Sequence, residues 1–544
     1  MKKLIEETKI FLQGSKLAES LSAELANELY CPILLENGEN LESVLAEALV
    51  QGRDVVVAGT AGGGKTMLLN QILQKIDKPL EDLLILDEVE NLGLLSKNRL
   101  DNKIIIIRDL TALDSSEVLR IITSKDRGPM LVAANEGALL DKNYAGFFNQ
   151  VIQDLHQIQS GWKVNENKNA VVLDMAAVDP VNYALKKLLT HPLLHSAVSL
   201  TEEEKGIKNS IRMQGLAQLT DPKNAEAIAG LIRSAIGPGE ITFREMWNFI
   251  SDIFLEGENE SVPPTSVWFW RLFKGQSQIS KIVSEVLKPE FLAFPHKSFA
   301  MFHGDVQSLQ LQDNLSNLWI HPGANAIDCQ NEIQKNNLIQ WIRIQYAFLD
   351  NLFTMPKQSI FVGSFSTNLY TRVAKKLEKI SLIQALNSYF RRKQPLEGDS
   401  PELELWIDTM VERRQDRSLG SVSLGNISAS QLELIKSNVI ANLSNYNLEG
   451  SKLFLQPTSD KALTFGGLEI TGKLFRALAK GRPNSHYDRE NDDVELAIKK
   501  FYFLISNNLK IEQNDVLSFL NTPHDGISKE YKWKIQKPIS NLGV

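Results

Sequence analysis

Five apolar runs recur along the first third of the chain, and segments with helical spacing of apolar residues separate most of them. The runs are rich in Val, Ile and Leu, which is typical of strands buried on both faces of a parallel sheet. They lie at residues 54–58, 83–87, 103–109, 129–135 and 170–174. Helical spacing occurs at residues 40–50, 67–74, 114–123 and 137–159. This alternation predicts an α/β domain built on a parallel sheet.

The chain becomes predominantly helical after the fifth run. Helical patterns cover residues 181–189, 225–236 and 242–255, and a polar, proline-containing stretch at 257–264 is typical of a linker. Further helical patterns follow, such as 338–353 and 372–391, with one expected hairpin at 451–456 and 462–465. We therefore expect an N-terminal helical segment at 1–35, an α/β core at 36–179, a helical lid at 180–258 and a mostly helical C-terminal interaction region at 265–544.

Composition narrows the class of protein without naming a function. The 544 residues carry a net charge of -7, which argues against a basic surface over the whole chain but leaves room for a local basic patch. The two cysteines, Cys31 and Cys329, exclude a disulfide framework and fit a reducing compartment. No apolar run is long enough to span a bilayer. We expect a cytoplasmic protein without a membrane partner.

The residues that follow the first apolar run read GTAGGGKT, the complete G-x-x-x-x-G-K-T pattern of a P-loop. A strand before it and a helix after it are the context that this motif requires. Its glycines let backbone N–H groups wrap a phosphate chain, and the helix N-terminus adds a positive dipole end. The motif predicts ATP and Mg²⁺ as cofactors, with Lys65 on the β- and γ-phosphates and Thr66 on the metal. The expected nucleotide-binding residues are Gly59, Thr60, Ala61, Gly62, Gly63, Gly64, Lys65, Thr66 and Met67.

Two aspartates compete for the metal-side acid that a P-loop ATPase needs. The sequence around Asp87, LLILDE, is the better match to four apolar residues followed by Asp and Glu, whereas Asp109 ends the third strand. Five strands with the P-loop on the first is a count that resembles the AAA+ core. In that arrangement we expect the third strand beside the P-loop strand and the second at the sheet edge. This order favours Asp109 over Asp87.

The choice of Asp109 leaves the water-activating base open, because Leu110 follows it instead of Glu. Glu88 or Glu136 is then expected to orient the attacking water. If neither does, hydrolysis is slow, and a protein that binds ATP to hold a conformation is the alternative.

Two further side chains are candidates for contact with the γ-phosphate. Asn135 ends the fourth strand, where a polar side chain can reach the phosphate or its water, and its alternative role is to cap the next helix. Arg244 lies in the first turn of the helix that Thr242 caps, where a cation is unfavourable beside the helix dipole unless a phosphate compensates it. A solvated surface arginine is the alternative. From 136 to 169 the chain has no arginine to serve a neighbouring subunit.

The C-terminal half contains basic clusters around residues 372–379, 391–393, 413–417 and 473–482. They could contact nucleic-acid phosphates. Acidic residues interleave with several of them, and we favour solvated helix faces for each cluster taken singly.

The ordered set GTAGGGKT, IIIIRD, AANEG, VVLDMA and GEITFREMWNFISDIF resembles bacterial anti-phage defence ATPases of the AAA+ type, nearest to the DptF-type ATPase of phosphorothioation-dependent DNA restriction systems. The resemblance implies a motor or switch subunit of a multi-subunit antiviral complex, in which ATP turnover licenses a partner effector and DNA is a further partner. The alternatives are a STAND-like signalling NTPase that forms homo-oligomers on ATP binding with little turnover, and a DNA-binding scaffold with structural nucleotide.

Overall fold

The computed structural model divides the chain into two compact units, Met1–Ser359 with Ser437–Lys452, and Ile360–Lys436 with Leu453–Val544. Each unit is described here by itself. The structure describes residues 28–76, 79–86, 100, 103–141, 145–160, 170–196, 222, 225, 228–229, 232, 241–255, 277–286, 376–391, 402–408, 419–436, 440–443, 445–448, 452–458, 467–471, 473–474, 477–478, 492–508, 516–522 and 529–534. Most of the expected N-terminal helical segment and the expected helix at 338–353 lie outside these residues.

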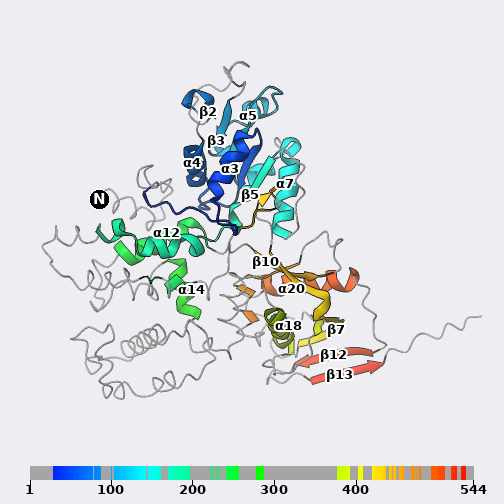
Figure 1. Ribbon diagram of the computed structural model, residues 1–544. Helices are drawn as coiled ribbons and strands as arrows, with labels where there is room; N and C mark the ends of the chain where they lie inside the picture. The colour runs from blue at the N-terminus through cyan, green and yellow to red at the C-terminus, as the bar shows by residue number, and fades with distance from the viewer. Residues whose placement is uncertain are drawn as a thin grey trace, which may run out of the picture. The chain divides into compact units, whose positions relative to one another are not determined.

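The first unit is built on a six-stranded sheet with the order β2-β3-β4-β1-β5-β9 (Figure 1). Its first five strands run parallel to their neighbours, and β9 pairs antiparallel with β5. The strands are β1 (Asp54–Ala58), β2 (Leu83–Ile85), β3 (Ile104–Ile107), β4 (Met130–Ala134), β5 (Ala170–Asp174) and β9 (Ile440–Ala441). The predicted parallel α/β sheet is confirmed, and each of the five apolar runs supplies one strand.

The strand order corrects one expectation. We expected β3 to lie beside the P-loop strand β1, but β4 pairs with both and separates them. The β2 strand does lie at the sheet edge, as expected. The apolar runs predict which segments become strands, but they do not predict which strands are neighbours, because the runs are alike in hydropathy. The residue that follows β4, Asn135, is therefore closer in sheet order to the P-loop than Asp109.

Helices cover both faces of this sheet. Alternate strand residues such as Val55 and Val57 pack with α3 (Leu41–Val50) and α4 (Lys65–Lys75). The residues between them, such as Val56, pack with α5 (Ser115–Ile122) and α7 (Ala145–Ser160). The short α6 (Glu136–Leu139) precedes α7, and η1 (Leu80–Asp82) precedes β2. Burial on both faces explains why these strands carry continuous apolar runs rather than alternating ones.

A segment from the far end of the chain closes one edge of the sheet. Strand β9 joins β5, with Ala441 opposite Val172, although β8 and β10 on either side of the segment belong to the second unit. Asn442 has a left-handed backbone with φ 66°, is 1% exposed, and donates through Nδ2 to Asp154 Oδ2 at 3.2 Å and to the Ala170 carbonyl. This segment, residues 437–452, is therefore part of the first unit.

Short turns and helices continue the first unit after β5. They are η6 (Met175–Ala177), the π-helical turn η7 (Val181–Leu185), α8 (Lys186–Leu189), α12 (Phe243–Leu255) and α14 (Gln278–Val286). Thr242 caps α12 as predicted: its Oγ1 accepts from the Glu245 N–H at 3.2 Å, and the Glu245 carboxylate accepts from the Thr242 N–H at 2.7 Å. This reciprocal capping box fixes the start of α12. Asn40, in contrast, precedes α3 without a side-chain cap hydrogen bond.

The second unit contains two antiparallel sheets with the orders β11-β10-β8 and β13-β12-β7-β6. The prediction of a mostly helical C-terminal region is thus not met in the described residues beyond 400, because segments such as ELELWID alternate with the period of a half-buried strand. The expected hairpin at 451–456 supplies β10, which pairs with β11, while 462–465 lie outside the described residues. The elements are α18 (Lys376–Arg391), β6 (Glu402–Asp408), β7 (Leu419–Ser428), η12 (Ala429–Gln431), β8 (Leu432–Lys436), β10 (Leu453–Pro457), β11 (Leu468–Glu469), α20 (Asp492–Asn508), β12 (Val516–Thr522) and β13 (Lys529–Lys534).

Where the chain is described, its helices are all too short or too polar to cross a membrane.

Candidate functional site

The P-loop lies between β1 and α4 and has three glycines with positive φ: 148° at Gly59, 82° at Gly62 and 82° at Gly64. Neighbouring residues also exclude larger side chains at these positions. A Cβ on Gly59 would stand 2.9 Å from Met175 Cβ, and one on Gly64 would stand 2.8 Å from the Phe243 ring. Backbone conformation and close packing both require glycine here. The loop is thus held between η6 on one side and the start of α12 on the other.

Lys65 is held by three hydrogen bonds at the carboxyl end of the sheet. Its Nζ donates to the carbonyl oxygens of Gly59 at 3.0 Å and Thr60 at 2.8 Å, and to Asn135 Oδ1 at 2.8 Å. Burial lowers the pKa of the Lys65 ammonium, and the charge of Asp109 acts in the opposite direction. The structure therefore brings Lys65, Asn135 and the charge of Asp109 together.

Asp109 follows β3 and is exposed, while the next residue, Leu110, is buried and anchors the turn η5 (Leu110–Ala112). Asp109 Oδ1 accepts from the Thr111 backbone N–H at 2.9 Å and from Thr111 Oγ1 at 2.6 Å. Thr66, the other expected metal ligand, is exposed in the first turn of α4. An exposed hydroxyl and an exposed carboxylate are suitable oxygen donors for a Mg²⁺ ion that keeps part of its water shell.

The start of α12 packs directly on the P-loop. The Arg244 N–H donates to the Gly62 carbonyl at 3.2 Å, and a Cβ on Gly62 would lie 3.0 Å from Arg244 Cβ. The ring of Phe243 stands against Gly64 and also contacts Tyr183, at 5.8 Å between ring centroids. Arg244 therefore lies beside the P-loop, and its contact with a γ-phosphate stays a prediction.

Of the two candidates for the water-activating base, the structure describes Glu136 but not Glu88. Glu136 directly follows Asn135, opens α6 and is partly buried. Glu88 and the competing metal-side acid Asp87 lie outside the described residues. Among the described residues, Glu136 is therefore the predicted base, and it follows Asn135, which accepts a hydrogen bond from Lys65.

Asp174 was not predicted from the sequence. It ends β5 opposite Ala58, the last residue before the P-loop, and is fully buried. Its Oδ1 accepts from the Ala176 N–H at 2.9 Å, whereas Oδ2 has no hydrogen-bond partner in the described part of the chain. Burial raises the pKa of Asp174, opposed by the charge of Lys452. The feature of the sequence that could have pointed to Asp174 is its position at the end of an apolar run, which it shares with Asp109.

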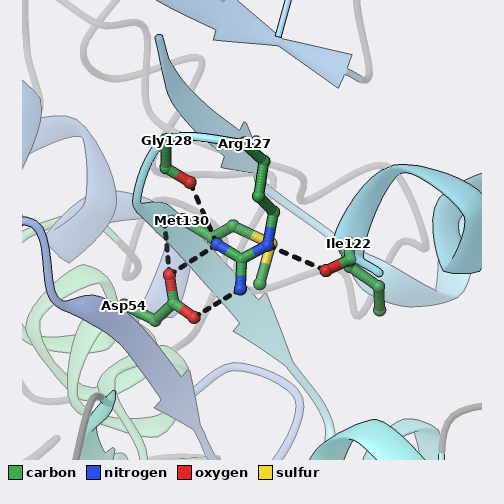
Figure 2. A network of polar contacts seen from close by, with 5 residues as sticks. All are labelled: Asp54, Ile122, Arg127, Gly128 and Met130. Carbon is green, nitrogen blue, oxygen red and sulfur yellow. Dashed lines mark hydrogen bonds and ion pairs between the residues drawn. The ribbon is translucent and has the colours of Figure 1, made fainter. Parts of the chain in front are cut away.

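Arg127 and Asp54 form a half-buried network at the opposite ends of the strands from the P-loop, where β1 and β4 begin (Figure 2). Arg127 donates to Asp54 at 2.7 and 2.9 Å through two nitrogens, and to the carbonyls of Ile122 and Gly128. Asp54 also accepts from the Met130 N–H at 2.9 Å. The contacts join the start of β1 to the start of β4, so this network stabilises the sheet and takes no part in the P-loop site.

No family model, curated protein or solved structure matches this chain. Among the described residues, no group of three or more His, Cys, Asp or Glu side chains forms a metal cluster. Any function must therefore be argued from the geometry of the P-loop site.

Proposed function

We propose that this protein binds ATP with Mg²⁺ and hydrolyses it. The observation that carries the proposal is the 2.8 Å hydrogen bond from Lys65 of a complete P-loop to Asn135 at the end of the adjacent strand. It joins the phosphate-binding lysine to the polar strand end expected to contact the γ-phosphate or its water. Parallel α/β sheets place ligand sites at the carboxyl ends of their strands, and both residues lie there.

Each candidate residue has a distinct role in this proposal. Lys65 and the loop amides hold the phosphates, Thr66 and Asp109 hold the Mg²⁺ and its water, and Asn135 and Arg244 contact the γ-phosphate. Glu136 orients the attacking water, since it adjoins Asn135, with Glu88 as the second candidate. The Mg²⁺ ion supplies neutralisation of the charge that develops on the phosphates.

A capped helix, α12, packs on the P-loop of an α/β sheet with five parallel strands. This arrangement supports an AAA+-like core with α12 as the last helix of a lid, although β4 and not β3 lies beside β1. On the resemblance of the ordered motifs, we propose further that the chain is a motor or switch subunit of a bacterial defence complex, with protein partners and DNA. The competing proposal is a nucleotide-gated switch with little turnover. Leu110 favours it, because this residue follows Asp109 at the position where a water-activating Glu is usual.

The test is ATP hydrolysis by the purified full-length chain, with and without double-stranded DNA. Lys65→Ala and Asp109→Ala are expected to lower turnover by on the order of 100-fold or more. Matched controls are Lys75→Ala, at the exposed end of the same helix, and Asp114→Ala, an exposed aspartate that caps α5. Glu136→Gln should lower turnover by about 100-fold or more while ATP still binds, whereas Glu117→Gln should not.

The outcomes separate the competing functions. Turnover that both variants lose and that DNA raises supports a DNA-coupled motor. Tight ATP binding without turnover overturns the hydrolase and supports the switch, which is then tested by nucleotide-dependent assembly of the chain. Failure of the wild type to bind ATP overturns both.

A further inference from the structure

Two strands of the sheet, β3 and β5, lead into the same local structure. Asp174 ends β5 and Asp109 lies two residues after β3; each accepts a hydrogen bond from the backbone N–H two residues later and opens a short 3-10 turn. The two turns differ in the residue that donates. Ala176 offers only its N–H to Asp174, whereas Thr111 adds a hydroxyl that donates to Asp109 Oδ1 at 2.6 Å.

The two aspartates also differ in how deeply they are buried. Asp174 is fully buried, and packing around it restricts its carboxylate. Asp109 is exposed, so packing cannot hold its carboxylate in one orientation. Both Thr111 donors end on the same oxygen, Oδ1, and a hydroxyl at 2.6 Å from a carboxylate is a short, charge-assisted hydrogen bond. Oδ2 takes no part in this turn.

We propose that Thr111 is a positioning residue for Asp109: its hydroxyl fixes the carboxylate so that the remaining oxygen faces the water shell of the nucleotide-bound Mg²⁺. The inference rests on the proposed ATP and Mg²⁺ site. It also explains how an exposed aspartate can keep the orientation that the Mg²⁺ site requires. Outer-shell partners of metal ligands typically contribute 10- to 100-fold to metal affinity, so the loss of one hydroxyl has a measurable effect.

The chain contains a matched control for the ordinary capping role of such a hydroxyl. Ser116 donates to Asp114 Oδ1 at 2.6 Å through Oγ and at 3.0 Å through its backbone N–H. This pair caps α5 and is equally exposed. If the Thr111 hydroxyl only stabilises a turn, removal of either hydroxyl should have the same effect.

The experiment compares Thr111→Val, Thr111→Ser and Ser116→Ala in the full-length chain. Mn²⁺ binding is measured by electron paramagnetic resonance in the presence of a non-hydrolysable ATP analogue, and the Mg²⁺ concentration for half-maximal turnover is measured alongside. Thr111→Val is expected to weaken metal binding by about 10-fold or more, with nucleotide binding in EDTA unchanged. Thr111→Ser should retain wild-type metal binding, and Ser116→Ala should match wild type.

Three results would overturn the inference: wild-type metal affinity in Thr111→Val, loss of metal affinity in Thr111→Ser as large as in Thr111→Val, or equal losses in Thr111→Val and Ser116→Ala. If Thr111→Val does not fold, Thr111→Ala is used with the same expectations. A wild-type chain that binds the ATP analogue without any metal dependence overturns the proposed Mg²⁺ site itself, which is a separate outcome.

Discussion

Lys65 Nζ and Asn135 Oδ1 are joined by a 2.8 Å hydrogen bond, although 70 residues separate them in the sequence. The bond links the P-loop to the strand that pairs with β1, and two backbone carbonyls complete the contacts of the ammonium. The amide of Asn135 therefore helps to fix the position of the Lys65 ammonium.

Replacing Asn135 tests this relationship. Asn135→Ala removes the side-chain acceptor from Lys65 but keeps both carbonyl acceptors, so we expect ATP to bind within a few-fold of wild type. Turnover should fall by on the order of 100-fold, because a group aimed at the reacting phosphate is lost. Steady-state hydrolysis and binding of a fluorescent ATP analogue measure the two effects. Asn70→Ala, half-buried on α4, is the control, and an equal loss of turnover in both variants would contradict the role of Asn135.

Breaking the ion pair between Arg127 and Asp54 should lower stability without lowering catalysis. The two side chains are 15% and 16% exposed, and Arg127→Met leaves the Asp54 carboxylate with an uncompensated charge. Such losses cost about 3 kcal/mol. We expect a lower unfolding midpoint by scanning calorimetry. Turnover per folded molecule should be unchanged, because the pair lies at the opposite ends of the strands from the P-loop. The double variant Asp54→Asn/Arg127→Met should recover part of the loss; no recovery would contradict this account.

Asp174 is expected to make the stability of the first unit depend on pH. Burial raises the pKa of Asp174 above the value of about 3.8 for an unfolded aspartate. As the pH rises above that value, the unfolded chain loses the proton first, so the free energy of unfolding falls until the pH passes the pKa of the folded state. Asp174→Asn keeps the acceptor for the Ala176 N–H and removes the charge. The variant should therefore unfold at a higher temperature than wild type at pH 7.

The difference between Asp174→Asn and wild type should shrink toward zero as the pH falls below 4. Thermal unfolding at a series of pH values from 4 to 8 measures it. The variant Asp114→Asn is the comparison, because hydrogen bonds from Ser116 and Glu117 lower the pKa of that exposed carboxylate. A constant difference across the pH range would show that packing, and not the charge of Asp174, sets the effect.

Asn442 is expected to anchor the segment 437–452 to the core. Asn442→Ala removes the donor to the buried Asp154 and places alanine in a left-handed conformation, with costs of about 1–3 and 1–2 kcal/mol. Asn442→Gly removes the same donor but tolerates the backbone conformation. Unfolding midpoints should thus rank wild type above glycine above alanine. Equal midpoints for wild type and alanine would mean that the segment does not stabilise the core.

Much of the core could be predicted from the sequence because its strands are buried on both faces. Continuous runs such as Ile104–Ile107 leave no alternative to a central strand, and the P-loop pattern defines the turn after β1. Strand neighbours could not be predicted, since they depend on long-range pairing. The two residues of β9 are too few to show any periodicity.

The sequence could single out Lys65, Asn135 and Arg244 as candidates, because each is one residue type at one position of a motif or strand end, and the structure places all three around the P-loop. It was not predictable where a contact depends on side-chain orientation. The hydroxyl of Thr111 and the buried carboxylate of Asp174 are ordinary residues in the sequence, and only the turns that follow β3 and β5 give them a partner or a position.

The late position of β9 also sets the order in which the core can form during synthesis. Residues 272 apart in the sequence, Ala170 and Asn442, must both leave the ribosome before the edge of β5 is covered. At typical rates of synthesis this takes roughly 15–50 s, during which the β5 edge has unpaired backbone groups and is open to pairing with other chains. The first unit is therefore open to mispairing at the β5 edge until its last strand arrives.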